Sequence, residues 1–328
     1  MRTGIWSVFL WMAALAQPAA AQTHLTASGQ AYPTKPIRMV IPFTAGSQTD
    51  MLARLIGPKM LESWGQQVIV DNRPGAGGSV AGNIVVNASA DGYTLMLSSS
   101  AFATSAALGL KLPYDPLKDF AGVTQVAIST NVWVVSPSLG VKSANELIAL
   151  ARQKPGQINF ASAGIGSGTH YIGELFKLAA NIDVVHVPYK GTPEALTDTM
   201  AGRVQYYISP IMPALPLIRS GRLLALAVTN AQRAPLLPDV PTLAEAAVPG
   251  WQYDGWFGLW AHAKTPHKII NVVSSEVARI LELPDVKERI VSQGGVPKSS
   301  TPEELNRLVR TEVETRGKVL KASGARAD

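Results

Sequence analysis

The sequence predicts an α/β fold built as two α/β lobes. Short, largely apolar runs recur between helical patterns, and two Gly/Ser-rich loops each join such a run to a helix in a different half of the chain. The apolar runs are continuous and do not alternate with polar residues, which is typical of parallel strands covered on both faces. Right-handed crossovers restrict the topology further. We therefore expect parallel sheets whose carboxyl-terminal strand ends carry the two loops.

The first 21 residues have the pattern of a secretory signal peptide. Arg2 gives a positive start, the run from Ile5 to Ala16 is apolar, and Ala19-Ala20-Ala21 offers a small-residue cleavage site. The apolar run is too short to cross a bilayer, although an uncleaved anchor is the alternative. We expect export to the periplasm with removal of residues 1–21.

Composition excludes several kinds of site. The 328 residues include no cysteine, which rules out disulfides, a thiolate nucleophile and cysteine metal ligands. The five histidines lack metal-binding spacing, so we expect neither a metal nor a cofactor. The net charge of +6 favours anionic ligands, but no basic run with interleaved aromatic residues supports a nucleic-acid partner.

The predicted elements begin after a polar N-terminal stretch. Helix starts are marked by a capping box at Ser143 and Glu146, and by Thr192 and Thr301, each followed by a proline at the first helical position. The last helix carries an apolar stripe that predicts a core-facing side. The expected strands are Ile37–Ile41, Gln67–Val70, Thr94–Ser98, Val123–Ile128, Asn131–Val135, Ile158–Phe160, Val184–Val187, Val204–Ile208 and Leu223–Thr229.

The first loop, Pro42 to Asp50 (PFTAGSQTD), suits an anion, because such a loop directs backbone N–H groups and a helix dipole at one point. The alternative interpretation is that the loop is an ordinary strand-to-helix turn with a well-capped helix. Asp50 would repel an anion, so we expect its carboxylate to accept loop N–H groups and fix the helix start. The candidate ligand-binding residues here are Phe43, Thr44, Ala45, Gly46, Ser47, Gln48 and Thr49.

The second loop, Ser162 to His170 (SAGIGSGTH), contains glycines that allow a ligand to approach the backbone. It lacks the third glycine of the dinucleotide fingerprint, and neither serine lies in a G-x-S-x-G elbow. An exported hydrolase using Ser162 or Ser167 with His170 is the competing hypothesis. The candidate ligand-binding residues are Ser162, Ala163, Gly164, Gly166, Ser167, Gly168, Thr169 and His170.

Other residues are expected near the same cleft. Ser98 and Ser99 end a strand and are candidates for hydrogen bonds to a carboxylate. Lys190 lies in a turn where it faces either an anion or solvent. The glycine cluster from Asp71 to Gly82 is interpreted as a structural turn or as one side of the cleft. The aromatic stretch from Trp251 to Trp260 is interpreted as core, with one ring lining the pocket.

From Tyr32 to Asp328 the chain resembles the Bug-type periplasmic receptors of tripartite tricarboxylate transporters. The resemblance rests on the order and spacing of YPTKPIRMVIPF, the loop ending in Thr49-Asp50, DNRPGAGG, DGYTL, LPYDPLKDF, KPGQINFASAG, VHVPYKGTPEALTD, LALAVT and LPDVPTLAEA. It implies a type II periplasmic-binding-protein fold, with two α/β lobes around a ligand cleft. Residues 30–124 and 230–328 would form the first lobe and residues 125–229 the second. It also implies that the two loops bind a small carboxylate.

The chain departs from the family pattern in two places. Ser47 and Gln48 follow Gly46 where relatives carry further glycines, which reshapes the pocket. Ile208-Ser209-Pro210 replaces a common Phe-Asp-Asn, so an acid that could pair with a ligand ammonium is absent. Ser209 joins the candidate ligand residues. The resemblance thus favours a carboxylate or dicarboxylate without a free amine, and terephthalate is one aromatic example.

The resemblance also implies partners and a mechanism without chemistry. The lobes would close over the carboxylate, and a monomeric receptor would deliver it to membrane permease subunits. Alternatively, the receptor would report to a sensor kinase, because the sequence does not separate sensing from transport.

Overall fold

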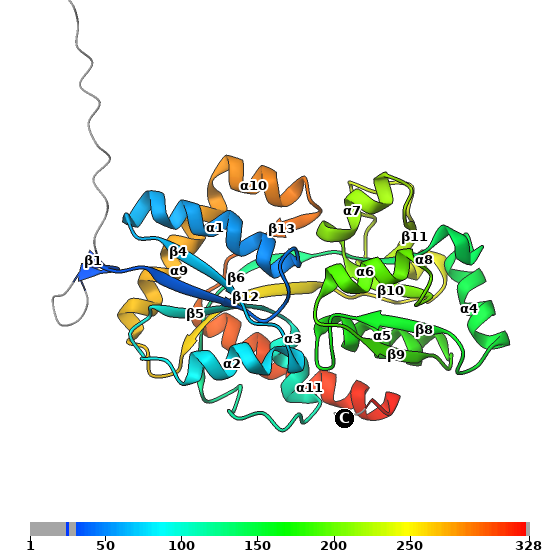
Figure 1. Cartoon of the computed structure of the whole chain (residues 1–328), viewed down its shortest axis with the longest axis horizontal. Helices are drawn as coiled ribbons and strands as arrows, with labels where there is room; N and C mark the ends of the chain where they lie inside the picture. The colour runs from blue at the N-terminus through cyan, green and yellow to red at the C-terminus, as the bar shows by residue number, and fades with distance from the viewer. Residues whose placement is uncertain (1–23, 26–30, 326–328) are drawn as a thin grey trace, which may run out of the picture.

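A computed structural model describes residues 24–25 and 31–325, so the expected signal peptide lies outside the described residues. Two lobes lie side by side, each built on one sheet (Figure 1). A two-stranded ribbon, β1 (His24–Leu25) and β2 (Ala31–Tyr32), precedes them. Among the described residues, no helix combines the length and the apolar character needed to cross a bilayer.

Lobe 1 contains a six-stranded sheet in the order β13-β6-β12-β5-β3-β4. Helices α1, α9 and α10 pack on one face, and helices α2, α3 and α11 pack on the other. The strands are β3 (Ile37–Ile41), β4 (Val68–Asn72), β5 (Thr94–Ser99), β6 (Phe120–Ser129), β12 (Gly255–His262) and β13 (Gly295–Pro297). The helices are α1 (Gln48–Trp64), the 3-10 turn η1 (Ala76–Gly78), α2 (Ser79–Val86), α3 (Ala101–Ala107), α9 (His267–Glu282), α10 (Pro284–Val291) and α11 (Pro302–Ser323).

Lobe 2 contains a five-stranded sheet in the order β11-β7-β10-β8-β9. Helices α4, α5 and α8 pack on one face, and helices α6 and α7 pack on the other. The strands are β7 (Asn131–Val135), β8 (Asn159–Ser162), β9 (Val185–Pro188), β10 (Tyr206–Pro210) and β11 (Leu224–Val228). The helices are η2 (Pro137–Leu139), α4 (Ala144–Gln153), α5 (Gly168–Ala180), α6 (Thr192–Met200), α7 (Ile211–Arg219) and α8 (Leu243–Ala246).

The chain passes twice between the sheets. At Thr130, β6 of lobe 1 continues into β7 of lobe 2. The return runs from β11 through α8 to β12, and Trp251 and Tyr253 on this segment pack with the lobe 2 core. The predicted lobe boundary at 124/125 therefore falls within β6, and the one at 229/230 falls just after β11.

The expectation of parallel sheets is correct for only part of each sheet. Strands β3, β4 and β5 are parallel, as are β8, β9 and β10, but β7 runs antiparallel to β10 and β11. Strand β12 likewise runs antiparallel to β5 and β6. Strands β7 and β12 follow the two passages of the chain between the lobes, and the short strand β13 is also antiparallel to its neighbour β6. Their apolar runs resemble those of the parallel strands because helices cover both faces of each sheet.

Most predicted element bounds agree with the structure to within a few residues. Two helix starts differ in detail. Thr192 begins α6 after the N-cap Gly191, so it is not the cap itself. Glu146 accepts a bond from Lys142 N, so only the Ser143 half of the predicted capping box forms. Thr301 caps α11 as predicted, and it also forms a full capping box with Glu304 that was not predicted.

Candidate ligand-binding site

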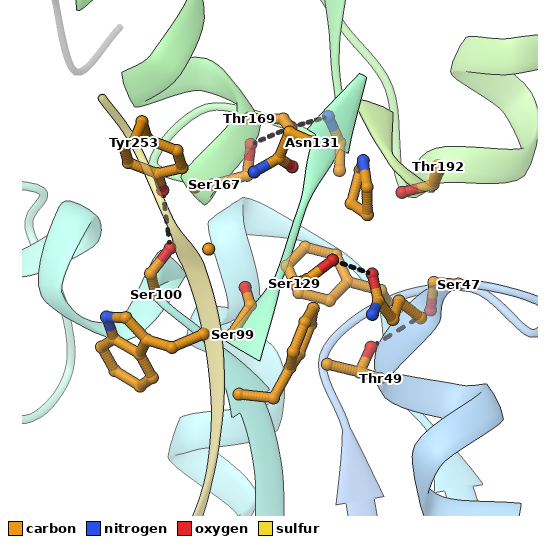
Figure 2. A pocket seen from close by; sticks show the side chains of 18 residues that line it. Ser47, Thr49, Ser99, Ser100, Ser129, Asn131, Ser167, Thr169, Thr192 and Tyr253 are labelled. Atoms are coloured by element: carbon orange, nitrogen blue, oxygen red, sulfur yellow. Dashed lines mark hydrogen bonds between the residues drawn. The ribbon is translucent and has the colours of Figure 1, made fainter. Parts of the chain in front are cut away.

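The two Gly/Ser-rich loops meet between the lobes. One joins β3 to α1 on lobe 1, and the other joins β8 to α5 on lobe 2. A cavity of about 40 Å³ lies between them, and Figure 2 shows hydroxyl groups from both lobes around it. Its lining is Phe43, Ser47, Gln48, Thr49, Ser99, Ser100, Ser129, Asn131, Ala163, Ser167, Gly168, Thr169, Thr192, Pro210, Tyr253, Gly255, Trp256 and Phe257.

Asp50 holds the first loop in shape, as the sequence predicted. Its Oδ2 accepts a bond from Gly46 N at 2.9 Å, and its Oδ1 pairs with Arg54 Nε at 3.0 Å. Gly46 has a φ of +81°, which favours glycine. Burial acts to raise the pKa of Asp50, but the Arg54 and Gly46 hydrogen bonds outweigh it, so the pKa lies below its usual value. The carboxylate is therefore committed to the loop.

Helix α1 begins without a side-chain cap. The Ser47 hydroxyl instead donates to Thr44 O at 2.7 Å, so the first-turn N–H groups keep no side-chain partner from their N-cap residue. Gln48 and Thr49 in that first turn line the cavity. The Gln48 carbonyl oxygen accepts a 2.8 Å bond from Ser129 Oγ, which fixes the side chain against the crossover strand (Figure 2). The positive end of α1 thus points at the cavity.

Helix α5 is capped by its own loop. Ser167 Oγ accepts a bond from His170 N at 3.0 Å and contacts Thr169 Oγ1 at 3.0 Å. Thr169 Oγ1 in turn accepts a bond from Ala163 N at 2.8 Å. The loop is therefore tied to the helix start on the side that faces the cavity.

A histidine pair supports the second loop from behind. Ser162 Oγ lies 2.6 Å from His186 Nε2, and Gly166 N donates to His170 Nδ1 at 3.2 Å. The two imidazole rings stack at 4.1 Å. Burial lowers the pKa of His170 to about 4, and burial with the nearby His170 lowers the pKa of His186 to about 3. Both rings are therefore neutral at pH 7.

This arrangement does not resemble a hydrolytic site. His170 hydrogen-bonds to Gly166 N, and no bond joins it to Ser162 Oγ among the described residues. Its Nε2 lies 3.9 Å from Glu174 Oε1, on the side away from the ligand cavity. Ser162 does pair with His186, but it is fully buried and does not line the cavity. Among the described residues, no serine that lines the cavity bonds to a histidine ring.

Several lining residues were not predicted. Ser129 and Asn131 flank the first crossover, and Tyr253 lies on the second, so they reach the cavity only through the topology. The Asn131 Nδ2 group is buried without a hydrogen-bond partner in the described structure. A buried donor without a partner is costly unless a ligand or water satisfies it. Asn131 is therefore a strong addition to the candidate site.

The cavity wall carries no charged side chain among the described residues. It combines hydroxyls, amides and two helix N-termini with the aromatic rings of Phe43, Trp256 and Phe257. Hydrogen-bond donors with no negatively charged side chain beside them suit a carboxylate, whose oxygens accept charge-assisted hydrogen bonds. Within residues 24–25 and 31–325, no group of three or more metal-ligating side chains comes together.

A second cavity of about 220 Å³ lies next to the first. Phe43 and Ala163 line both cavities and pack together, so they form a wall between them. Lys190 and Gly164 line this outer cavity, together with the glycine cluster at 75–78. That cluster therefore closes one side of the outer cavity, which was one of its two predicted roles.

The remaining predicted residues lie around the cavities without lining either of them. Thr44 donates to Glu194 Oε2 across the cleft at 2.9 Å. Ser98 and Ser209 are buried and bond to neighbouring backbone oxygens. The others in this group are Ala45, Gly46, Ser162, Gly166 and His170, and a ligand role for all eight stays a prediction.

Two lobes around a donor-lined cleft define a solute-binding protein with the two-lobe periplasmic-binding-protein fold. The model of the tripartite tricarboxylate transporter family receptor matches residues 52–325, and the chain belongs to this family. The predicted family is thereby confirmed.

Individual relatives agree over nearly the whole chain. The protein BugT of Bordetella pertussis is 35% identical over 321 residues, which cover 97% of this chain and 96% of BugT. Rpa4515 of R. palustris, solved with adipate, has a TM-score of 0.86 and 36% identity, covering 89% of this chain and 98% of that one. MatC of Rhodopseudomonas palustris, solved with malate, has a TM-score of 0.84 and 32% identity. This match covers 88% of this chain and 100% of MatC.

Proposed function

We propose that this chain is a periplasmic receptor that captures a small carboxylate or dicarboxylate between its lobes and delivers it to membrane permease subunits. Residues 1–21 direct its export and are then removed. The observation that carries the proposal is the cavity itself. It has hydrogen-bond donors from both lobes, the unpartnered Asn131 amide and no charged side chain on its described wall.

The available interactions are strong enough for such a receptor. A charge-assisted hydrogen bond contributes roughly 1.5–3 kcal/mol, and micromolar affinity needs about 8 kcal/mol net. A few bonds from the first turns of α1 and α5, with burial of ligand carbon against the aromatic wall, reach this value after the cost of closure.

The lining also limits the class of ligand. It offers no carboxylate for a ligand ammonium, which supports a guest without a free amine. Relatives solved with adipate and malate support a carboxylate. The inner cavity has room for about three waters, which is enough for a carboxylate head group. An aromatic dicarboxylate such as terephthalate would need the wall formed by Phe43 and Ala163 to move.

The proposal assigns the chain no catalysis. It acts as a monomer that binds and releases its guest unchanged, without a metal or cofactor. In the described structure the His170 imidazole bonds to Gly166 N and to neither Ser162 nor Ser167, which supports this assignment.

A thermal-shift screen of the purified protein against adipate, malate, terephthalate and benzoate tests the proposal. At 100 times its dissociation constant a specific ligand should stabilise by about 2.7 kcal/mol, a shift of several degrees. Chromatography of the same samples should recover the compound unchanged. Turnover that disappears in Ser162→Ala would favour the hydrolase instead.

A further inference from the structure

Arg316 is a buried cation in the middle of α11. Its side chain is 3% exposed, and its Nη2 pairs with Glu312 Oε2 at 2.7 Å one turn earlier. Its Nη1 donates to Thr104 Oγ1 at 2.7 Å. The guanidinium lies over the ring of Tyr171 at 4.4 Å and near that of Tyr253 at 5.8 Å.

These contacts place Arg316 directly behind the ligand cavity. Figure 1 shows α11 running beneath lobe 1 and ending beneath lobe 2, and it packs on both α3 and α5. Tyr253 and Ser100 line the cavity, and their hydroxyl oxygens lie 3.2 Å apart (Figure 2). Arg316 contacts the Tyr253 ring, and Thr104 bonds to Ser100 O at 3.1 Å. Only one layer of side chains therefore separates the guanidinium from the cavity.

We propose that the Arg316–Glu312 ion pair sets the electrostatic potential of the cavity and so its preference for anions. In this proposal Arg316 is a positioning residue that acts through Ser100 and Tyr253, and Glu312 partly offsets its charge. The inference rests on the proposed function, because it concerns a carboxylate guest.

Arg316 and Glu312 differ in solvent exposure, and this difference gives the ion pair a net effect on the electrostatic potential of the cavity. Arg316 is enclosed, so its charge is poorly screened towards the cavity. The Glu312 side chain is 22% exposed, although its Oε2 is buried, so water reaches this carboxylate in part and screens its charge more strongly than that of Arg316. The pair should therefore leave a positive potential at a cavity whose described wall has no charge. Protein stability alone is a weak reason to bury such an ion pair, since proteins in which apolar residues replace a buried pair are often as stable.

A purely structural role makes a different prediction. If the pair only clamped α11 to α3 and α5, removing either partner would loosen the same contacts. Both changes would then weaken ligand binding in the same direction, for charged and neutral compounds alike. If the charge matters, the two changes act in opposite directions and only on charged compounds.

The test compares Arg316→Gln, Glu312→Gln and Arg310→Gln by calorimetry at low salt. Arg310 is exposed on the same helix, so its change removes the same charge away from the cavity. The probes are adipate, malate and terephthalate, each beside its uncharged diamide. We expect Arg316→Gln to weaken carboxylate binding about tenfold and Glu312→Gln to tighten it about threefold. Diamide affinities and the Arg310→Gln variant should change less than about twofold.

Each outcome supports or overturns the inference. If both Arg316→Gln and Glu312→Gln weaken carboxylate binding, or if they change diamide binding equally, the pair has a structural role and the inference is overturned. If Arg316→Gln does not fold, Glu312→Gln decides alone, since only the electrostatic role predicts tighter binding. If the wild type binds the carboxylates but neither variant differs from it, the inference alone fails. If the wild type binds none of them, the proposed function fails and the inference falls with it.

Discussion

Gly168 of lobe 2 lies directly against Ser100 of lobe 1. A Cβ atom built on Gly168 would lie 2.5 Å from Ser100 Oγ. Gly168 is the first residue of α5, so the positive end of that helix approaches the opposite lobe through bare backbone. A side chain at this position would therefore require Ser100 Oγ or one of the lobes to move.

We expect Gly168→Ala to weaken ligand binding about tenfold or more, because the methyl group keeps the lobes from closing fully. The apo protein should unfold at nearly the same temperature, since an open cleft removes the clash. Calorimetric titration with adipate or another ligand found in the screen, together with an apo melting curve, measures both effects.

Gly317→Ala is the matched control. Gly317 lies within α11, and its nearest atom to an added Cβ is Ala107 O at 3.7 Å, an ordinary contact. This change should stabilise the apo protein by about 0.5–1 kcal/mol and leave affinity unchanged. If Gly168→Ala binds as tightly as the wild type, the close approach is not required for closure.

Ser167→Ala should cost about 1 kcal/mol of stability and also weaken binding. The hydroxyl caps α5 through His170 N and lines the cavity, so the two losses have one cause. Ser167→Thr keeps a capping hydroxyl and should retain most of the stability. Urea unfolding and titration of the same samples separate the effects, and unchanged stability in the alanine variant would contradict the capping role.

The sequence carried enough information to predict the parts of the site that follow from local pattern. Both loops meet across one cleft. The Asp50 carboxylate bonds to the first loop, as expected of a group that would repel an anionic ligand. Such features depend on short segments, namely a strand end, a glycine and a helix start. The family followed from motif order, which is also a property of the sequence alone.

Features that depend on distant pairing could not be predicted in this way. The aromatic stretch was interpreted as core, and its rings are buried. That most of it forms the central antiparallel strand β12 could not be predicted, because an apolar run does not show in which direction a strand pairs. Ser129 and Asn131 become site residues only because β6 and β7 cross between the lobes. Arg316 lies 146 residues beyond the end of the second loop and 266 beyond the end of the first, and no local pattern marks it as buried.

The buried histidine pair predicts a loss of stability in mild acid. The pKa of His170 is lowered by burial to about 4 and that of His186 to about 3, against an unfolded value near 6.5. Below pH 6.5 the unfolded chain therefore binds more protons at these two histidines than the folded protein does. The stabilising contribution is complete above pH 6.5 and is lost as the pH falls towards 4. The slope is at most about 1.4 kcal/mol per pH unit for each histidine.

Urea unfolding between pH 7 and pH 4.5 measures this slope. His186→Gln should reduce it, whereas His267→Gln should not, because His267 is exposed at the start of α9. Burial raises the pKa of Glu174 beside His170, and this acts in the opposite direction, whereas the lowered pKa of Asp50 adds to the loss in acid, so the difference between the variants and the wild type isolates the histidine contribution. A wild-type slope equal to that of His186→Gln would contradict the prediction.

Phe43→Ala should change which carboxylates fit. Phe43 packs on Ala163 and separates the inner cavity of about 40 Å³ from the outer one of about 220 Å³. Without the ring the two spaces join, so binding should shift towards larger guests, with terephthalate gaining relative to malate. Phe102→Ala is the control, since that ring is equally buried but does not line either cavity. Each change should cost about 3–5 kcal/mol of stability, but only Phe43→Ala should alter the affinity ratio measured by calorimetry. An unchanged ratio would mean that another side chain limits the size of the guest.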